Sequence, residues 1–300
     1  MVSNNIIITE DSSRKLENLV KLINYTQTKH EQDEFSICQI QKLTEKTPFE
    51  ILNSVLRFKE SKSEPWLRLD GMPKTKHSEV LLLIASLLGN PFAHEQEAEL
   101  VCSVKPKKEA IGTSQTAFFT WNKFDLHTEL PYHTMPPDYL ILYCVENVPG
   151  GITLTSSALN ALEHLDKKDR SLLQEEAFKI AIPPHFRHSN SHSTERPIIY
   201  KNGSVLERIR VRFDGIECCT NRHEKALMQL KTQLEKGRVE HHLNPGDMLI
   251  INNRLSVHGR TAFNPRFDNK DRELKRVYVI EDLASVKQWY VKNRRRVLGF

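Results

Sequence analysis

The chain has 300 residues, of which 39% are apolar and 27% are charged, and its 43 basic and 38 acidic residues give a net charge of +5. This composition is typical of a globular protein with one large or two small domains, and it excludes a collagen-like or low-complexity chain. No apolar run approaches the roughly 20 residues of a transmembrane helix. We therefore expect no membrane-spanning segment and no membrane partner.

The first 90 residues are expected to be mainly helical. Apolar residues recur at helical spacing in three segments, at 10–30, 48–61 and 77–90. The first has a candidate N-cap at Ser12 or Ser13, and the third ends at Gly89, a residue type that commonly closes helices.

Short β-rich runs follow, bounded by Gly, Pro, Asn and Asp. They are 98–104, 116–122, 138–145, 152–157, 196–200, 209–214, 246–252 and 276–280. Two segments with helical periodicity interrupt them, at 156–177 and 221–237. Because the strands do not alternate regularly with helices, the pattern favours a β-sandwich or jelly roll over a parallel doubly wound sheet.

The cysteines and the N-terminus indicate a cytoplasmic protein. The five cysteines are odd in number, include no CxxC pair, and include two adjacent residues, Cys218 and Cys219. This pattern is typical of reduced thiols rather than structural disulfides. The N-terminal residues lack a basic segment followed by an apolar one, so we expect no signal peptide.

Two groups of basic side chains raise the alternative of a nucleic-acid-binding module. Lys105, Lys107 and Lys108 form one group, and Arg294 to Arg296 form the other. Such groups can contact phosphates, but they are more often solvated surface. We therefore expect no nucleic-acid partner.

The stretch "FDLHTELPYH" (124–133) contains a candidate metal site. On a strand, residues i and i+2 point to the same face, so His127 and Glu129 could reach one cation. Two histidines and one carboxylate on one face of an octahedral ion suit non-haem Fe(II). The pair alone is weak evidence, since seven histidines lie within 185–258 and each could be proposed as the third ligand.

A longer pattern narrows the choice. The segments "LHTELPYH", "TLTSS" and "PGDMLIINNRLSVHGRTAFNPRFDNKDRELKRVYV" occur in this order. With them the chain resembles the clavaminate synthase-like branch of the Fe(II)/2-oxoglutarate-dependent oxygenases, related to the TauD/TfdA superfamily. That branch includes bacterial asparagine, arginine and lysine hydroxylases. The resemblance implies one α+β domain, 1–300, with a helical part to about residue 90, a double-stranded β-helix (jelly roll) core with helical inserts over about 91–285, and a short C-terminal tail.

The resemblance also implies roles for individual residues. His127, Glu129 and His258 match the Fe(II) ligands. Arg272 and Thr153 match the residues that bind the distal carboxylate of 2-oxoglutarate, with Thr155 as an alternative to Thr153. Arg276 matches the arginine that binds the substrate's α-carboxylate.

The arginine chemistry agrees with these roles. A guanidinium pairs bidentately with a carboxylate, and residues 272 and 276 would share one face of a strand. The alternative for each is a surface ion pair with Asp268, Asp271 or Glu273.

The substrate is less well defined. Glu95 or Gln96 occupies the place of a family residue that contacts the substrate amine, although a solvated charged run fits equally well. Asp214, and after it Glu217, falls where relatives place acidic residues against the distal group. Acidic residues there would suit a basic substrate such as arginine or lysine.

We therefore expect an enzyme that uses Fe(II), 2-oxoglutarate and O2 to hydroxylate a free L-amino acid, releasing succinate and CO2, as a monomer or homodimer. The alternative is the same chemistry on a carrier-bound amino acid, a peptide or a natural-product intermediate, with hydroxylation, desaturation or cyclisation as the outcome. A binding module without catalysis remains the third alternative.

Overall fold

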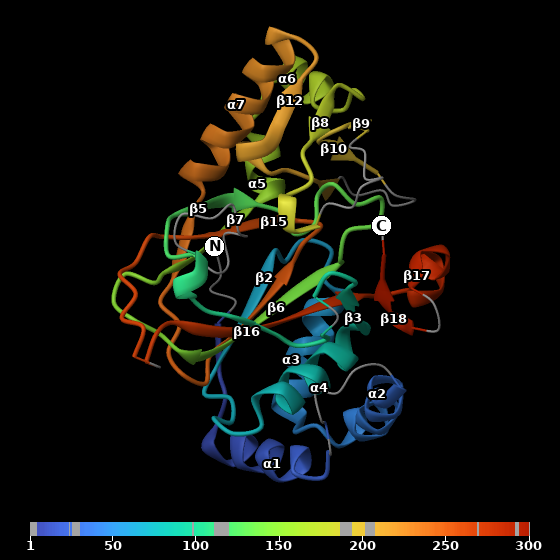
Figure 1. Cartoon of the computed structure of the whole chain (residues 1–300), viewed down its shortest axis with the longest axis vertical. Helices are drawn as coiled ribbons and strands as arrows, with labels where there is room; N and C mark the ends of the chain where they lie inside the picture. Colours follow the sequence, from blue (N-terminus) through green and yellow to red (C-terminus); the bar gives the residue numbers. More distant parts are fainter. Residues whose placement is uncertain are drawn as a thin grey trace.

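The computed structural model describes residues 5–23, 25, 31–97, 99–110, 120–186, 194–201, 208–268, 270–291 and 294–299. These residues form a mixed α+β structure with a larger and a smaller main sheet (Figure 1). The helices are α1 (Glu10–Val20), α2 (Glu31–Leu43), α3 (Phe49–Glu60), α4 (His77–Leu88), α5 (Ala158–Glu163), α6 (Lys167–Leu172) and α7 (Asn221–Lys236). Within the described ranges, no helix combines the length and apolar character needed to cross a membrane.

The larger sheet is buried on both faces at its centre. In order, its strands are β1 (Asn5–Ile7), β2 (Trp66–Asp70), β14 (Met248–Asn252), β6 (Tyr139–Glu146), β16 (Glu273–Ile280), β3 (Asn90–His94), β18 (Arg294–Leu298) and β17 (Tyr290–Val291), and β4 (Cys102–Val104) also pairs with β16. Strand β6 shows the alternation of a two-sided strand. Tyr139, Ile141 and Tyr143 belong to one apolar cluster, and Leu140, Leu142 and Cys144 belong to another.

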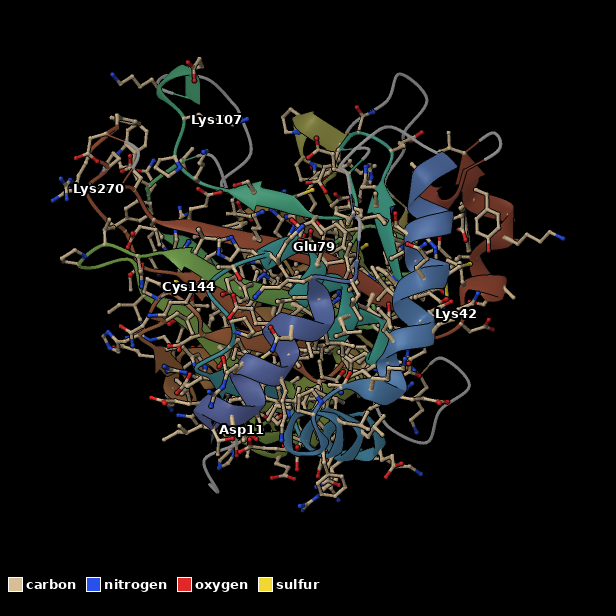
Figure 2. The ribbon with its side chains drawn as sticks, turned by 90° about the horizontal axis from the view of Figure 1, so that it is seen from below. Asp11, Lys42, Glu79, Lys107, Cys144 and Lys270 are labelled. Carbon is tan, nitrogen blue, oxygen red and sulfur yellow. The ribbon has the colours of Figure 1, made fainter. Side chains whose placement is uncertain are left out.

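Helices α1 to α4 cover one face of this sheet, as Figures 1 and 2 show. Helix α4 packs against β16 and against α1, α2 and α3. Because it is enclosed in this way, α4 is apolar nearly all round, and ten of its twelve residues are buried.

The smaller sheet faces the other side of the larger one. Its order is β13 (Val239–His241), β7 (Thr153–Ser157), β15 (Ser256–Arg260) and β5 (Phe124–His127). Helices α5 and α7 pack against it, so that it lies between the larger sheet and these helices (Figure 1). Beyond it, β8 (Phe178–Ile180), β9 (Glu195–Arg196) and β12 (Ile216–Cys218) form a third sheet, and β10 (Ile199–Tyr200) pairs with β11 (Arg208–Ile209).

The helical expectations need three corrections. Helix α1 begins after Thr9, whose side chain accepts a hydrogen bond from the Ser12 amide, and it ends at Val20. Helix α2 was not predicted. The single helix expected over 156–177 is two short helices, because Ser157 and Asp166 each cap a separate helix start.

The strand expectations also need correction. The expected strand at 98–104 is restricted to β4. Most of 116–122 lies outside the described residues, and 120–122 contains no strand. The expected C-terminal tail instead contributes β18, which pairs in parallel with β3.

Candidate active site

The two histidines of the candidate metal site lie on neighbouring strands. His258 on β15 is directly opposite His127 at the end of β5, and the two ring centroids are 4.2 Å apart. The ladder then has a bulge, where a Cβ on Gly259 would lie only 2.7 Å from the carbonyl oxygen of Phe124. Glycine at this position therefore permits the close approach of β5 to β15.

The hydrogen bonding of His127 fixes which nitrogen is available to a metal. Its Nδ1 lies 2.8 Å from the carbonyl oxygen of Asp125. Because a carbonyl oxygen can only accept, Nδ1 carries the proton, and Nε2 keeps a free lone pair.

Glu129 completes the group from just beyond the end of β5. Its Oε2 lies 3.4 Å from Nε2 of His258, and its Oε1 accepts a hydrogen bond of 2.9 Å from the Tyr278 hydroxyl. One ligand atom from each of His127, Glu129 and His258 lies within 4.8 Å of the others. Two imidazole nitrogens and one carboxylate oxygen are the donor set that suits non-haem Fe(II), so the residues fit this ion.

The protonation states also fit a metal site. Burial and the neighbouring His258 lower the pKa of His127 to about 3. Burial alone would raise the pKa of Glu129, but contacts with His258 and Arg276 hold that pKa well below its ordinary value. Both groups are therefore deprotonated at neutral pH, as metal coordination requires.

A cavity of about 520 Å³ opens onto these three residues from the space between the two main sheets. The larger sheet contributes Leu140, Leu142 and Leu274, and the smaller sheet contributes Thr153 and Arg260. The larger sheet also contributes Arg276, so a ligand in the cavity would contact both apolar and charged side chains on that side.

Arg272 enters the cavity immediately before β16. Its side chain is 3% exposed and donates from Nε to the Gly151 carbonyl at 3.1 Å and from Nη2 to Thr153 Oγ1 at 2.9 Å. Among the described residues no carboxylate pairs with it. Burial and the nearby Arg260 lower the pKa of Arg272 to about 9. Thr155, the alternative to Thr153, bonds instead to His241 at 2.7 Å.

Arg276 lies on the same side of β16 but is paired. Its guanidinium forms an ion pair with Glu97, and both side chains are 6% exposed. A second carboxylate oxygen, Glu129 Oε1, lies 3.9 Å from its Nη1. Burial alone would lower the pKa of Arg276, but Glu97 and Glu129 hold that pKa well above its ordinary value.

The structure brings only one of the four other substrate-binding candidates to the cavity. Asp214 lines it and is bonded to Arg212, with Nε–Oδ1 at 2.8 Å. Glu217 is exposed on β12, opposite Lys179 of β8. The Glu95 carboxylate lies close to Gly299, and Gln96 is exposed.

Sequence reasoning missed three residues of this site. Glu97 lies in the segment that was expected to contact substrate, one residue beyond the candidates. Tyr278 follows Arg276 by two positions, so the alternation of β16 could have placed it on the same face. Asn253, in the turn between β14 and β15, gave no sequence signal because its partners are distant along the chain.

Comparisons with known proteins agree with this geometry. The family model for taurine catabolism dioxygenase TauD, TfdA family, matches residues 67–278. An L-asparagine oxygenase from Streptomyces coelicolor is 33% identical over 211 residues, which cover 68% of this chain and 62% of the relative. An L-lysine 3-hydroxylase from Catenulispora acidiphila is 29% identical over 218 residues, covering 69% and 60%. The chain thus matches about three-fifths of the length of these two relatives.

Two solved structures share the fold over nearly their whole length. Asparagine oxygenase with Fe(II), 2S,3S-3-hydroxyasparagine and succinate has a TM-score of 0.89 at 24% identity and covers 99% of both chains. The non-heme iron oxygenase OrfP with Fe, succinate and (3S)-hydroxy-L-Arg has a TM-score of 0.87 at 20% identity, covering 98% of this chain and 99% of that one. With a family model that spans most of its length, the chain belongs to the TauD/TfdA dioxygenase family.

Proposed function

We propose that this protein is an Fe(II)/2-oxoglutarate-dependent oxygenase that hydroxylates an unactivated C–H bond of a free L-amino acid. The observation that carries the proposal is the occurrence, in one cavity, of a two-histidine, one-carboxylate group and a buried arginine that pairs with no described carboxylate. The first suits Fe(II) and the second suits the far end of a dicarboxylate.

His127, Glu129 and His258 would hold the metal, which with O2 supplies the oxidising chemistry when it is bound. The overall reaction consumes 2-oxoglutarate, O2 and the substrate. It breaks one C–H bond of the substrate and the C1–C2 bond of the oxoacid, and it yields the alcohol, succinate and CO2. One oxygen atom enters the product and the other enters succinate.

Arg272 and Thr153 would bind the distal carboxylate of 2-oxoglutarate. The guanidinium offers planar N–H donors, and its desolvation in the cavity strengthens the pairing with an anion. Thr153 orients that guanidinium, since its hydroxyl accepts from Nη2. This leaves the oxoacid end of the ligand free to approach the metal-binding residues.

The adjacent pair of Arg276 and Glu97 suits the head group of an amino acid. The arginine could bind the α-carboxylate and Glu97 the α-ammonium, so that each charge of the zwitterion meets its opposite. The names of the relatives, which are hydroxylases of asparagine, lysine, enduracididine, and ornithine or arginine, support this substrate class. A basic side chain could pair with Asp214, although it would compete there with Arg212.

We further propose that the two main sheets form a jelly roll within a single domain. The N-terminal β1 and β2 and the C-terminal β17 and β18 extend the same larger sheet at its opposite edges, which supports one domain. We propose a cytoplasmic location, which the five free cysteines support.

A screen of the twenty common amino acids with Fe(II) and 2-oxoglutarate tests the function. We expect at least one amino acid to gain one oxygen atom by mass spectrometry, with one succinate released per product molecule. The His258→Ala variant should abolish both signals. Product that has lost two hydrogens instead would indicate desaturation or cyclisation, and succinate release that no amino acid stimulates would contradict the proposed substrate class.

A further inference from the structure

The three metal-binding residues are not held in place in the same way. His127 and His258 are directly opposite each other on paired strands, so the hydrogen bonds of the sheet fix their separation. Glu129 lies outside β5. The next residue, Leu130, has φ of 47°, a left-handed conformation that is unfavourable for a branched side chain. The strand ladder therefore does not determine the position of Glu129.

The side chain of Asn253 contacts the main chain of Glu129 at two points. Its Oδ1 accepts from the Glu129 amide at 2.7 Å, and its Nδ2 donates to the Glu129 carbonyl at 3.1 Å. The same Nδ2 donates to the Pro137 carbonyl at 2.9 Å. Asn253 is only 3% exposed, and these bonds satisfy its amide, which would be costly to bury without partners.

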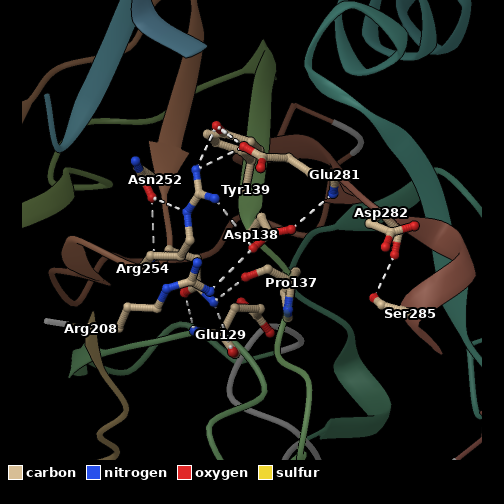
Figure 3. A network of polar contacts seen from close by, with 11 residues as sticks. Glu129, Pro137, Asp138, Tyr139, Arg208, Asn252, Arg254, Glu281, Asp282 and Ser285 are labelled. Atoms are coloured by element: carbon tan, nitrogen blue, oxygen red, sulfur yellow. Dashed lines mark hydrogen bonds and ion pairs between the residues drawn. The ribbon is translucent and has the colours of Figure 1, made fainter. Parts of the chain in front are cut away.

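The turn that carries Asn253 is itself anchored. The main-chain N–H of Asn253 donates to the Asp138 carbonyl at 3.0 Å. The next residue, Arg254, contacts the carboxylates of Asp138 at 3.5 Å and Glu281 at 3.0 Å, and it donates to the Tyr139 hydroxyl at 2.6 Å (Figure 3). The turn that places Asn253 against Glu129 is therefore held by residues at the ends of β6 and β16 in the larger sheet.

Tyr278 acts on the carboxylate itself. Its hydroxyl donates to Oε1 of Glu129 at 2.9 Å, whereas Oε2 faces His258 at 3.4 Å. Tyr278 is buried on β16, and its ring packs against Arg276 with the guanidinium carbon 4.5 Å from the ring centroid. One carboxylate oxygen is therefore occupied by a protein donor and the other is directed at the metal-binding histidine.

We propose that Asn253 and Tyr278 are positioning residues for the metal-binding carboxylate: Asn253 fixes the main chain of Glu129, and Tyr278 fixes the rotation of its side chain. This inference rests on the proposed metal site. Partners that orient a metal ligand commonly alter metal affinity by about 10- to 100-fold when they are removed. Asn253 and Tyr278 should therefore influence how strongly and with what geometry a metal is bound, in addition to packing the interior.

The inference is tested by titrating the intact protein with Co(II) under anaerobic conditions. Calorimetry and visible absorption measure the binding. Asn253→Asp keeps the size of the side chain and its acceptor oxygen, but it removes the two hydrogen bonds that Nδ2 donates to the carbonyls of Glu129 and Pro137. We therefore expect Co(II) affinity to fall by about 10- to 100-fold. Asn252→Asp is the matched control. Among the described residues, the Asn252 side chain is bonded through Oδ1, which accepts from the main-chain N–H and the Nε of Arg254, and aspartate keeps that oxygen. We expect its affinity to remain within about threefold of wild type, below the range for residues that orient a ligand.

Tyr278→Phe tests the second half of the inference. It preserves the ring and removes the hydrogen bond to Oε1, so we expect the Co(II) absorption bands to shift as the carboxylate changes its mode of binding. Tyr143→Phe is the control, since it removes a buried hydroxyl that donates to Pro73 on the opposite face of the larger sheet. Its Co(II) spectrum should match that of wild type.

Each outcome separates the inference from a purely structural role. Folded Asn253→Asp protein with wild-type Co(II) affinity, or an equal loss in Asn252→Asp, would overturn the role of Asn253. If Asn253→Asp does not fold, Asn253→Ser carries the same expectations, because serine is smaller and introduces no charge. An unshifted spectrum in Tyr278→Phe would overturn the role of Tyr278. A wild-type protein that binds no Co(II) would instead overturn the proposed function together with this inference.

Discussion

Two buried arginines of the site lie four residues apart but have opposite surroundings. Arg276 is enclosed by carboxylates, with Glu97 as its ion-pair partner and Glu129 nearby, and its pKa is raised. Arg272 is bonded only to a carbonyl and a hydroxyl among the described residues, and burial lowers its pKa to about 9. A buried cation without an anion is unfavourable, so the protein retains in Arg272 a strong site for an anionic ligand.

The difference suggests a division of the cavity into two binding regions. The region around Arg272 is cationic and matches a carboxylate of the cosubstrate. The region around Arg276 contains both signs of charge and matches a zwitterionic amino acid. Each of the following predictions tests this division.

Arg276→Met should lower the free energy of unfolding by about 3–5 kcal/mol, because it leaves the buried Glu97 carboxylate without its cation. Urea unfolding of the ligand-free protein measures this loss. The double variant Arg276→Met, Glu97→Leu should recover most of it, since apolar side chains then replace both charges. If Arg276→Met alone is as stable as wild type, the buried Glu97 carboxylate does not need Arg276 as its ion-pair partner.

Arg272→Met should raise the KM for 2-oxoglutarate by about 30-fold or more, because removing one partner of a buried charge pair costs about 2–5 kcal/mol. The stability of the ligand-free protein should be unchanged or higher, since no described carboxylate loses a partner. Steady-state kinetics and urea unfolding measure the two effects. An unchanged KM would remove Arg272 from the cosubstrate site.

Gly151→Ala should also weaken 2-oxoglutarate binding. A Cβ at this position would lie 2.7 Å from Cδ of Arg272 and 2.8 Å from Oδ1 of Asn147, so the arginine must move. Overpacking of this kind costs about 1–3 kcal/mol, which corresponds to about a 5- to 150-fold rise in KM. Gly215→Ala is the control, because its nearest neighbour would be the Ala181 Cβ at an ordinary 3.4 Å. Equal effects in the two variants would contradict the steric explanation.

Thr153→Val should have the smallest effect. It removes one hydrogen bond to Arg272, worth about 1 kcal/mol, and should raise the KM for 2-oxoglutarate by about fivefold. Thr155→Val removes a bond to His241 instead and should leave this KM unchanged. The reverse result would assign the cosubstrate role to Thr155.

The sequence predicted the three metal-binding residues because their arrangement follows from local rules and from one ordered motif. Alternation along an extended segment predicted that His127 and Glu129 lie together, and the motif around His258 supplied the third ligand. The positions of Arg272 and Arg276 on one side of β16 follow from the same alternation. These inferences used no knowledge of distant packing, although Glu129 lies beyond the end of β5 and its main chain is bonded to Asn253, 124 residues away.

Other features depend on contacts that a single sequence does not reveal. Glu97 was missed because its partner, Arg276, is 179 residues away in sequence. Helix α2 was not predicted, although Ile37 and Ile40 are three positions apart, as on one face of a helix, and both are buried by tertiary packing. Strand β18 was expected to be a tail, since its arginine-rich sequence gives no sign that Arg296 is buried beside Glu34.

Changing both the ligand and the residue tests whether Arg272 binds the distal carboxylate of 2-oxoglutarate. Anaerobic calorimetry of the Fe(II)-loaded protein would compare 2-oxoglutarate with 2-oxopentanoate, which lacks that carboxylate, in wild type and in Arg272→Met. We predict that wild type prefers 2-oxoglutarate by about 30-fold or more and that the variant binds both ligands with similar, weak affinity. An undiminished preference for 2-oxoglutarate in Arg272→Met would show that a group other than Arg272 binds this carboxylate.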